Sequence, residues 1–128
     1  MNVMKEEILT GLGMALNEAR VYLSLTETGL ATATKIADHS GIHRVNVYDA
    51  VNKLKEKGLV GEVTHEGKKC YVAAPPTALQ NILKEKEIQL NKIIHELNLC
   101  TQLSQKQDVQ IYEGYDFIRN MFLHFLEL

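Results

Sequence analysis

The chain has 128 residues, which suits one domain or a small domain with an appended oligomerisation segment. Hydrophobic residues make up 45% of it, so it can bury a core, and its apolar runs are far shorter than the ~20 residues that span a bilayer. The N-terminal residues are acidic where a secretory signal is basic, and two scattered cysteines do not suit a disulfide framework. We therefore expect a cytoplasmic protein without a membrane segment.

The net charge of −2 does not by itself indicate a nucleic-acid partner. Residues 1–76 carry nine basic and nine acidic side chains, whereas residues 77–128 carry five basic and seven acidic ones. Seven of the nine basic residues in the first part lie between Lys35 and Lys69. Because phosphate contacts depend on local as well as total charge, this composition permits DNA binding.

Four helical patterns occupy the N-terminal part of the chain. The first two are expected over residues 5–12 and from Leu16 to Gly29. Thr32 is a suitable N-cap for the third, and Gly41 can take the left-handed conformation that ends it. The fourth, over about residues 43–57, has an apolar side formed by Val47, Ala50, Val51 and Leu54.

Two short β-prone runs follow, at residues 59–65 and 68–73, and Glu66-Gly67 between them predicts a hairpin. Pro75-Pro76 then marks a boundary, because proline cannot continue a helix. Helix, helix, short turn, helix and hairpin is the order of a winged helix-turn-helix domain. We therefore predict a mainly α fold with a small β-hairpin wing.

Residues 78–104 form one uninterrupted helical pattern with an apolar seam whose spacing alternates between four and three residues. The members of this seam are Leu79, Leu83, Leu90, Ile93, Leu97 and Cys100, with Lys86 as a polar break. A helix of this length extends roughly 42 Å, more than a small winged-helix domain can cover. The seam thus predicts a coiled-coil dimerisation helix and a homodimer.

The C-terminal residues suggest a further small unit. Residues 108–112 alternate like a strand, and residues 115–127 read as a strongly apolar helix. The predicted domains are a winged helix-turn-helix at 1–76, a dimerisation helix at 77–104 and a strand–helix segment at 105–128.

The fourth helix is the candidate recognition helix, because its inner face is anchored and its outer face and N-terminus are polar. Its start is suited to phosphate, its asparagines to base edges and its valine to a thymine methyl group. Two lysines at the hairpin tip are suited to the DNA backbone or the minor groove. The candidate DNA-binding residues are His43, Arg44, Val45, Asn46, Tyr48, Asn52, Lys53, Lys68 and Lys69.

Several short motifs then occur in a fixed order. They are Glu18-Ala19-Arg20-Val21-Tyr22, Ser40-Gly41-Ile42, Val47-Tyr48, Leu54 before Gly58-Leu59-Val60, and Tyr71 before Pro75-Pro76. Together they resemble the TrmB family of archaeal and bacterial sugar-responsive transcriptional regulators, over about residues 8–104. The resemblance implies a winged-helix DNA-binding domain and a transcriptional role.

Three features depart from the family pattern. Ala15 stands where a serine cap is frequent, and His43 stands where a proline often opens the recognition helix. The chain also stops after residues 108–128, where family members usually continue into a large effector-binding domain. We therefore expect either a short member or a truncated chain, and sugar sensing does not carry over.

Other functional sites are not indicated by the sequence. His39 and His43 are four residues apart, but a turn separates them and no further ligand completes a metal set. Cys70 suits a strand packing position, and no nucleophile–base pair or Gly-rich phosphate loop stands out. We expect no enzyme activity, no metal and no cofactor.

The sequence therefore predicts a homodimeric, sequence-specific DNA-binding transcriptional regulator that acts on a roughly palindromic operator. One alternative is a protein-interaction adaptor built on a winged helix, which the near-neutral charge of residues 1–76 favours. Another alternative is an RNA-binding winged helix. It is less favoured, because the sequence shows no aromatic residues on an exposed sheet for bases to stack on. The operator, any effector, and repression or activation are left open.

Overall fold

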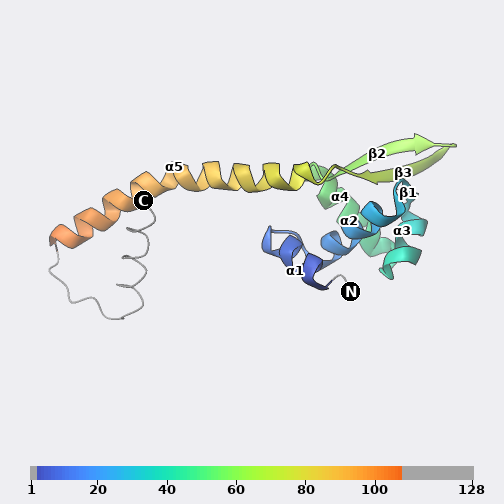
Figure 1. Cartoon of the computed structure of the whole chain (residues 1–128), viewed down its shortest axis with the longest axis horizontal. Coiled ribbons are helices and arrows are strands. Elements are labelled where there is room, and N and C mark those ends of the chain that lie inside the picture. Colours follow the sequence, from blue (N-terminus) through green and yellow to red (C-terminus); the bar gives the residue numbers. More distant parts are fainter. Residues whose placement is uncertain (1–2, 108–128) are drawn as a thin grey trace. The chain divides into compact units, whose positions relative to one another are not determined.

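The computed structural model describes residues 3–107 (Figure 1). Its elements in chain order are α1 (Val3–Gly11), α2 (Leu16–Thr28), β1 (Ala31–Thr32), α3 (Ala33–Ser40), α4 (Arg44–Glu56), β2 (Val60–His65), β3 (Lys68–Ala73) and α5 (Thr77–Gln107). The predicted winged helix-turn-helix followed by a long helix is confirmed. The chain divides into two compact units within α5, Met1–Glu87 and Ile88–Leu128. The strand–helix segment expected at 108–128 lies outside the described residues.

Helices α2, α3 and α4 pack together around one apolar core. Val21 of α2, Ile36 of α3 and Leu54 of α4 are fully buried, and each lies on the apolar side of its own helix. Leu59, directly after α4, is also fully buried and leads the chain into the hairpin. Burial of side chains from all three helices fixes the orientation of α4, so its opposite side faces solvent.

Two local signals set the turn between α3 and α4. The Thr32 hydroxyl accepts a hydrogen bond from the Lys35 N–H at 3.2 Å, which caps the start of α3 as expected. Gly41 ends α3 with φ of 75°, a left-handed conformation that costs glycine little because it has no Cβ. The tight turn between the helices of the helix-turn-helix thus follows from the sequence.

Strands β2 and β3 form the wing, an antiparallel hairpin that extends from the end of α4 (Figure 1). Glu66 and Gly67 at its tip have φ of 52° and 76°, as a two-residue turn with a right-handed strand twist requires. The two-residue strand β1 adds to the free edge of β3 and makes a three-stranded sheet of order β1-β3-β2. Strand β1 ties the start of α3 to the base of the wing.

Two residues of α2 hold the helical layer to the rest of the domain. The Tyr22 hydroxyl donates to the Ala74 carbonyl oxygen at 3.0 Å, just before the double proline, and burial raises the pKa of this phenol. The Glu18 carboxylate is buried, with 3% of the residue exposed. One of its oxygens accepts from the Ala15 N–H at 3.1 Å and the other from Lys57 Nζ at 2.5 Å. Glu18 therefore caps α2 and ties it to the end of α4.

Replacing Glu18 with alanine should lower the free energy of unfolding by about 1–3 kcal/mol, because the Ala15 amide then has no acceptor and Lys57 has no counter-charge. Lys57 is partly exposed and can rehydrate, so we expect a smaller effect than that typical of a fully buried pair. Urea denaturation followed by circular dichroism measures the change. Glu6→Ala breaks the more exposed pair with Arg20 and should cost under about 1 kcal/mol. Equal destabilisation in the two variants would contradict this role for Glu18.

Helix α5 starts directly after the double proline. Its first turns pack on the domain, since Ala78, Leu79 and Ile82 are partly buried against the core. Lys86 Nζ donates to the Leu12 carbonyl oxygen in the loop between α1 and α2. The polar break in the apolar seam thus has a partner within its own chain, and it anchors the first turns of α5.

Candidate nucleic-acid interface

Helix α4 presents a wide polar side to solvent. Val47, Ala50, Val51 and Leu54 are buried, as the helical pattern predicts. All nine candidate DNA-binding residues are exposed, seven of them on or just before α4 and two on β3. At 3.6 residues per turn, Val45 and Asn52 lie near the middle of the exposed side. Val45 is 61% exposed, so its methyl groups are available for contact with a partner.

His43 forms the N-cap of α4. Its Nδ1 accepts a hydrogen bond from the Val45 N–H at 3.3 Å. The imidazole thus caps the helix as a serine or aspartate side chain usually does. Proline is frequent at this position in the family that the sequence resembles. Its other nitrogen remains at the exposed start of the helix, beside Arg44.

Arg44 and Tyr48 form a pair one turn apart on α4. The guanidinium carbon lies 5.7 Å from the centre of the Tyr48 ring, and Nη2 donates to the Tyr48 hydroxyl oxygen at 3.2 Å. The ring face and the hydroxyl both restrict the arginine, whose remaining N–H groups can still donate to a ligand. Tyr48 therefore holds Arg44 in position.

A pocket of about 470 Å³ lies beside this pair, between the start of α3, α4 and β3. Its lining consists of Thr32, Ala33, Thr34, Arg44, Tyr48, Lys68, Lys69 and Tyr71. This α3–α4–β3 pocket brings together four of the candidate residues, including three cations from two elements. Among residues 3–107, no carboxylate belongs to the lining.

The remaining flank of α4 is a separate surface. Asn46 and Lys53 line a hollow of about 180 Å³ together with Asp49 and the first residues of α2. The candidate set is thus divided, with Arg44 and Tyr48 facing the α3–α4–β3 pocket and Asn46 and Lys53 on the other flank. Val45 and Asn52 lie between the two.

The charges at the base of the wing form a small network around Glu62. Lys55 Nζ lies 2.8 Å from one oxygen of this carboxylate, and Lys69 Nζ lies 3.9 Å from the other. The hydrogen bond from Lys55 lowers the pKa of the Glu62 carboxyl, and the same bond raises the pKa of Lys55. Lys55 is therefore the main counter-charge of Glu62, and Lys69 is only loosely held.

The predicted dimerisation residues are distributed along α5. Leu83, Leu90, Ile93 and Leu97 are each about half exposed, and Cys100 is exposed. Leu79 is different, because it is partly buried against the core of its own domain. The exposed part of the seam therefore starts at Leu83.

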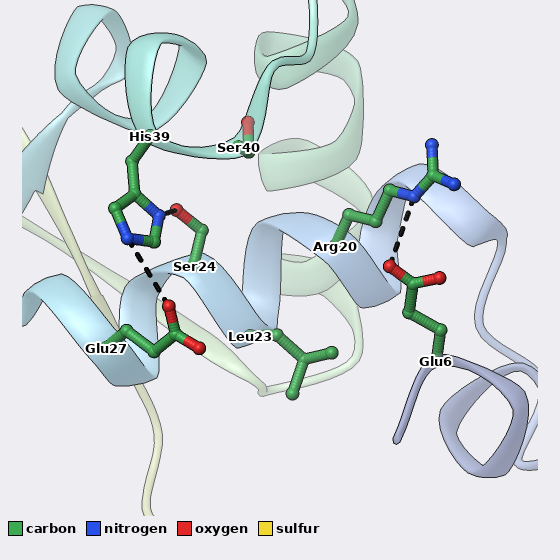
Figure 2. Close-up of a pocket in the computed structure, with 7 residues that line it drawn as sticks. All are labelled: Glu6, Arg20, Leu23, Ser24, Glu27, His39 and Ser40. Carbon is green, nitrogen blue, oxygen red and sulfur yellow. Dashed lines mark hydrogen bonds and ion pairs between the residues drawn. The ribbon is translucent and has the colours of Figure 1, made fainter. Parts of the chain in front are cut away.

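A polar pocket of about 450 Å³ lies at the surface shared by α1, α2 and α3 (Figure 2). His39 reaches across it, with Nδ1 2.7 Å from the Ser24 hydroxyl and Nε2 3.3 Å from the Glu27 carboxylate. The Arg20–Glu6 ion pair lies at the other side of the pocket. Both ring nitrogens of His39 are thus engaged in a contact that joins α3 to α2.

Serine, histidine and glutamate in contact resemble a catalytic triad only in composition. Ser24 lines the pocket, but it lies within α2 and is 4% exposed, so little of its surface is open to a substrate. Within the described part of the chain, no group of three or more His, Cys, Asp or Glu residues is placed to hold a metal ion. No helix among the described residues is long and apolar enough to cross a membrane.

Sequence reasoning did not identify Thr34 or Tyr71 as parts of the candidate interface. Thr34 is exposed in the first turn of α3, and Tyr71 is buried at the base of the wing. Burial raises the pKa of Tyr71, and the nearby Glu62 carboxylate adds to the effect. Thr34 could have been found from the Thr32 cap, which marks the following residues as the exposed start of a helix. The pairing of β1 with β3 that brings Tyr71 there has no local signal.

Several solved structures share this fold. TrmBL2, described as an archaeal chromatin protein whose structure shows a novel mode of DNA binding, aligns with a TM-score of 0.71 and 19% identity over 91% of this chain and 45% of its own. The ST1889 protein of Sulfolobus tokodaii has a TM-score of 0.51 and 23% identity, over 70% of this chain and 99% of its own. A MarR-family transcriptional regulator of Silicibacter pomeroyi has a TM-score of 0.53 and 12% identity, over 88% of this chain and 84% of its own.

These likenesses establish the winged-helix fold. This chain spans less than half the length of TrmBL2. Residues 9–77 match the family model described as "Sugar-specific transcriptional regulator TrmB". The match includes α2, α3, α4 and the wing, and covers more than half of the 128 residues. The chain therefore belongs to the TrmB family of transcriptional regulators.

Proposed function

We propose that the chain is a sequence-specific DNA-binding transcriptional regulator that acts as a homodimer on a roughly palindromic operator. Helix α4 enters the major groove, and the wing contacts the neighbouring backbone. The observation that carries this proposal is the exposed side of α4, where base-reading and apolar side chains lie beside a cluster of cations. Membership of the TrmB family and the DNA binding stated for TrmBL2 support it.

The middle of the exposed side of α4 carries the base contacts. Asn52 can donate and accept at once, as recognition of an adenine edge requires, and Val45 can contact a thymine methyl group. Asp49, on the same side, would repel phosphate but can accept from a cytosine amine. The flanking residues Arg44 and Lys53 contact phosphate and orient the helix.

The homodimer rests on the exposed part of the seam on α5. Leu83, Leu90, Ile93 and Leu97 recur at coiled-coil spacing, and each leaves about half of its surface in water. A second copy of the same helix covers them with the same spacing. Two recognition helices then meet two half-sites that lie about one or more helical turns of ~34 Å apart.

A protein-interaction adaptor is the second candidate function, and the balanced charge of residues 1–76 favours it. A salt titration against a random-sequence duplex separates the two functions. DNA binding should weaken steeply between about 50 and 200 mM salt, because bound cations release counterions from the duplex. If the protein does not bind the duplex even at low salt, the adaptor function is supported.

Changing Lys68 and Lys69 together to alanine should reduce the salt dependence of binding. The slope of log affinity against log salt should fall by about 0.9 for each phosphate that the wing no longer neutralises. Fluorescence anisotropy of a labelled duplex at several salt concentrations gives this slope. Lys84→Ala together with Lys92→Ala, two exposed lysines of α5, is the matched control and should leave it unchanged. An unchanged slope in the wing variant would remove the wing from the interface.

A further inference from the structure

The α3–α4–β3 pocket has the chemistry of a site for a single phosphate group. Its cations come from two elements that are far apart in the sequence, with Arg44 on α4 and Lys68 and Lys69 on β3. The hydroxyl groups of Thr34 and Tyr48 add uncharged hydrogen-bond donors. Cations together with hydroxyl donors suit a tetrahedral anion better than a flat base or an apolar ligand.

Arg44 is already oriented for such a ligand before anything binds. Its hydrogen bond to the Tyr48 hydroxyl uses one N–H group, and the ring below restricts the guanidinium plane. The other N–H groups remain as donors in a fixed fork, which matches two oxygens of one phosphate. Tyr48 is thus a positioning residue, because it orients the arginine and leaves most of its donors available.

The Glu62 carboxylate does not cancel the cations of the pocket. Glu62 is the directly opposed residue of Tyr71 across the β2–β3 ladder, so its carboxylate lies near the lining. Its closer contact is with Lys55 at 2.8 Å, whereas Lys69 is at 3.9 Å. Lys55 therefore neutralises most of this charge, and Lys69 can turn toward an anion at small cost.

The start of α3 adds a further favourable contribution from the other side. Ala33 and Thr34, in its first turn, line the pocket. First-turn amides have no acceptor within their own helix, and the helix dipole places partial positive charge there. This contribution supplements the side chains of Arg44, Lys68 and Lys69, which carry the main charge.

We propose that the α3–α4–β3 pocket binds one phosphate group, with Arg44 as its principal ligand and Tyr48 as the residue that positions Arg44. In the complex with DNA, this phosphate is a single backbone phosphate in each half-site. This assignment adds detail to the proposed function and rests on it. A free phosphorylated molecule carries the same chemistry. The two sources are separated by experiment.

The first arm uses a selected duplex in which each phosphate in turn is replaced by a neutral methylphosphonate. In the unmodified protein, one position per half-site should weaken binding about tenfold or more, as removal of a charge-assisted hydrogen bond does. In Arg44→Met the same replacement should cost clearly less, because the principal ligand of that phosphate is gone and only the two lysines and the hydroxyl donors of the pocket remain. Lys35→Met, which removes an exposed cation outside the pocket, should keep the full effect.

Tyr48→Phe tests positioning separately from charge. The ring and the arginine charge remain, so the salt slope should not change. The cost of neutralising the selected phosphate should fall, because the guanidinium is no longer held by the hydroxyl. An undiminished cost in this variant would show that Tyr48 does not position Arg44.

The second arm titrates the full chain with pyrophosphate and follows backbone amide resonances. Shifts at Thr34, Arg44, Tyr48, Lys68 and Lys69 that disappear in Arg44→Met support the pocket. If these shifts occur but no duplex binds, a free phosphate is the ligand and the proposed function fails. A third outcome is that a duplex binds while Arg44→Met changes neither the pyrophosphate-induced shifts nor the affinity lost at any single methylphosphonate. That result overturns the phosphate site, and the proposed function stands.

Discussion

Replacing Leu90 and Leu97 of α5 with aspartate should convert the protein to a monomer and remove most of its operator affinity. Both side chains are about half exposed in the single chain and lie on one stripe of the helix. In the proposed homodimer they are covered by the second copy, where unpaired aspartates are desolvated at high cost. A monomer also forgoes bivalency, which is worth about 100-fold or more in affinity.

Sedimentation velocity measures the assembly, and anisotropy with an operator duplex measures the affinity. The matched control is Asn91→Asp with Asn98→Asp, which adds the same two charges at exposed positions of α5 outside the seam. The control should remain a dimer. Circular dichroism should report a folded winged helix in both variants, because Leu90 and Leu97 are absent from its core. An unmodified chain that sediments as a monomer at ~100 µM, where helix seams of this apolar area associate, would contradict the homodimer.

Cys100 provides a native probe of how the two helices pair. It lies on the same seam and is exposed, whereas Cys70 is buried. In a parallel, in-register pair the two Cys100 thiols face each other, so mild oxidation links two copies. In an antiparallel pair they lie far apart, and the chain stays at monomer mass on a denaturing gel.

Asn52→Ala should weaken binding to the preferred site by about 1–3 kcal/mol and leave binding to random duplex nearly unchanged. Asn52 lies near the middle of the exposed side of α4, where a side chain reaches base edges. Arg44→Ala should instead weaken binding to all duplexes, because a phosphate contact carries no sequence information. Competition between specific and random duplexes measures both effects.

Glu56→Ala, on the same side of α4 but at its C-terminal end, is the control and should change neither affinity. If Asn52→Ala and Arg44→Ala, singly and together, leave both affinities unchanged, α4 is not the reading surface.

The order of the helices and of the two wing strands could be predicted because each of them carries a local signal. The Thr32 cap, the left-handed Gly41 and the Glu66-Gly67 tip occur where the sequence indicates them. The inward face of α4 is also confirmed, since helical periodicity alone determines which residues share a side. Helix ends differ from expectation by a few residues, as frayed termini usually do.

Contacts that join distant parts of the chain could not be predicted. Strand β1 has two residues, too few for an alternating pattern, and forms only because β3 offers an edge. The spacing on α5 indicates Lys86 as a polar break in a dimer seam, but its ammonium binds the Leu12 carbonyl oxygen. One of the two hydrogen bonds of Glu18 also comes from Lys57, 39 residues away.

The candidate interface could be predicted as a set of residues but not as a geometry. The sequence singles out both Arg44 and Tyr48, yet their pairing depends on side-chain conformation. Lys68 and Lys69 join them in one pocket because β1 brings β3 beside the start of α3. Contact of these residues with DNA stays a prediction.

The ratio of two duplex affinities shows whether the protein binds DNA sequence-specifically. Duplexes are selected from a random pool with the unmodified full chain, and the winning duplex is compared with a shuffled duplex of the same composition at one salt concentration. We expect the selected duplex to bind about 1,000-fold or more tightly and to contain two inverted half-sites. Equal affinity for the two duplexes, or no recovery above background, would show that the protein does not bind DNA sequence-specifically.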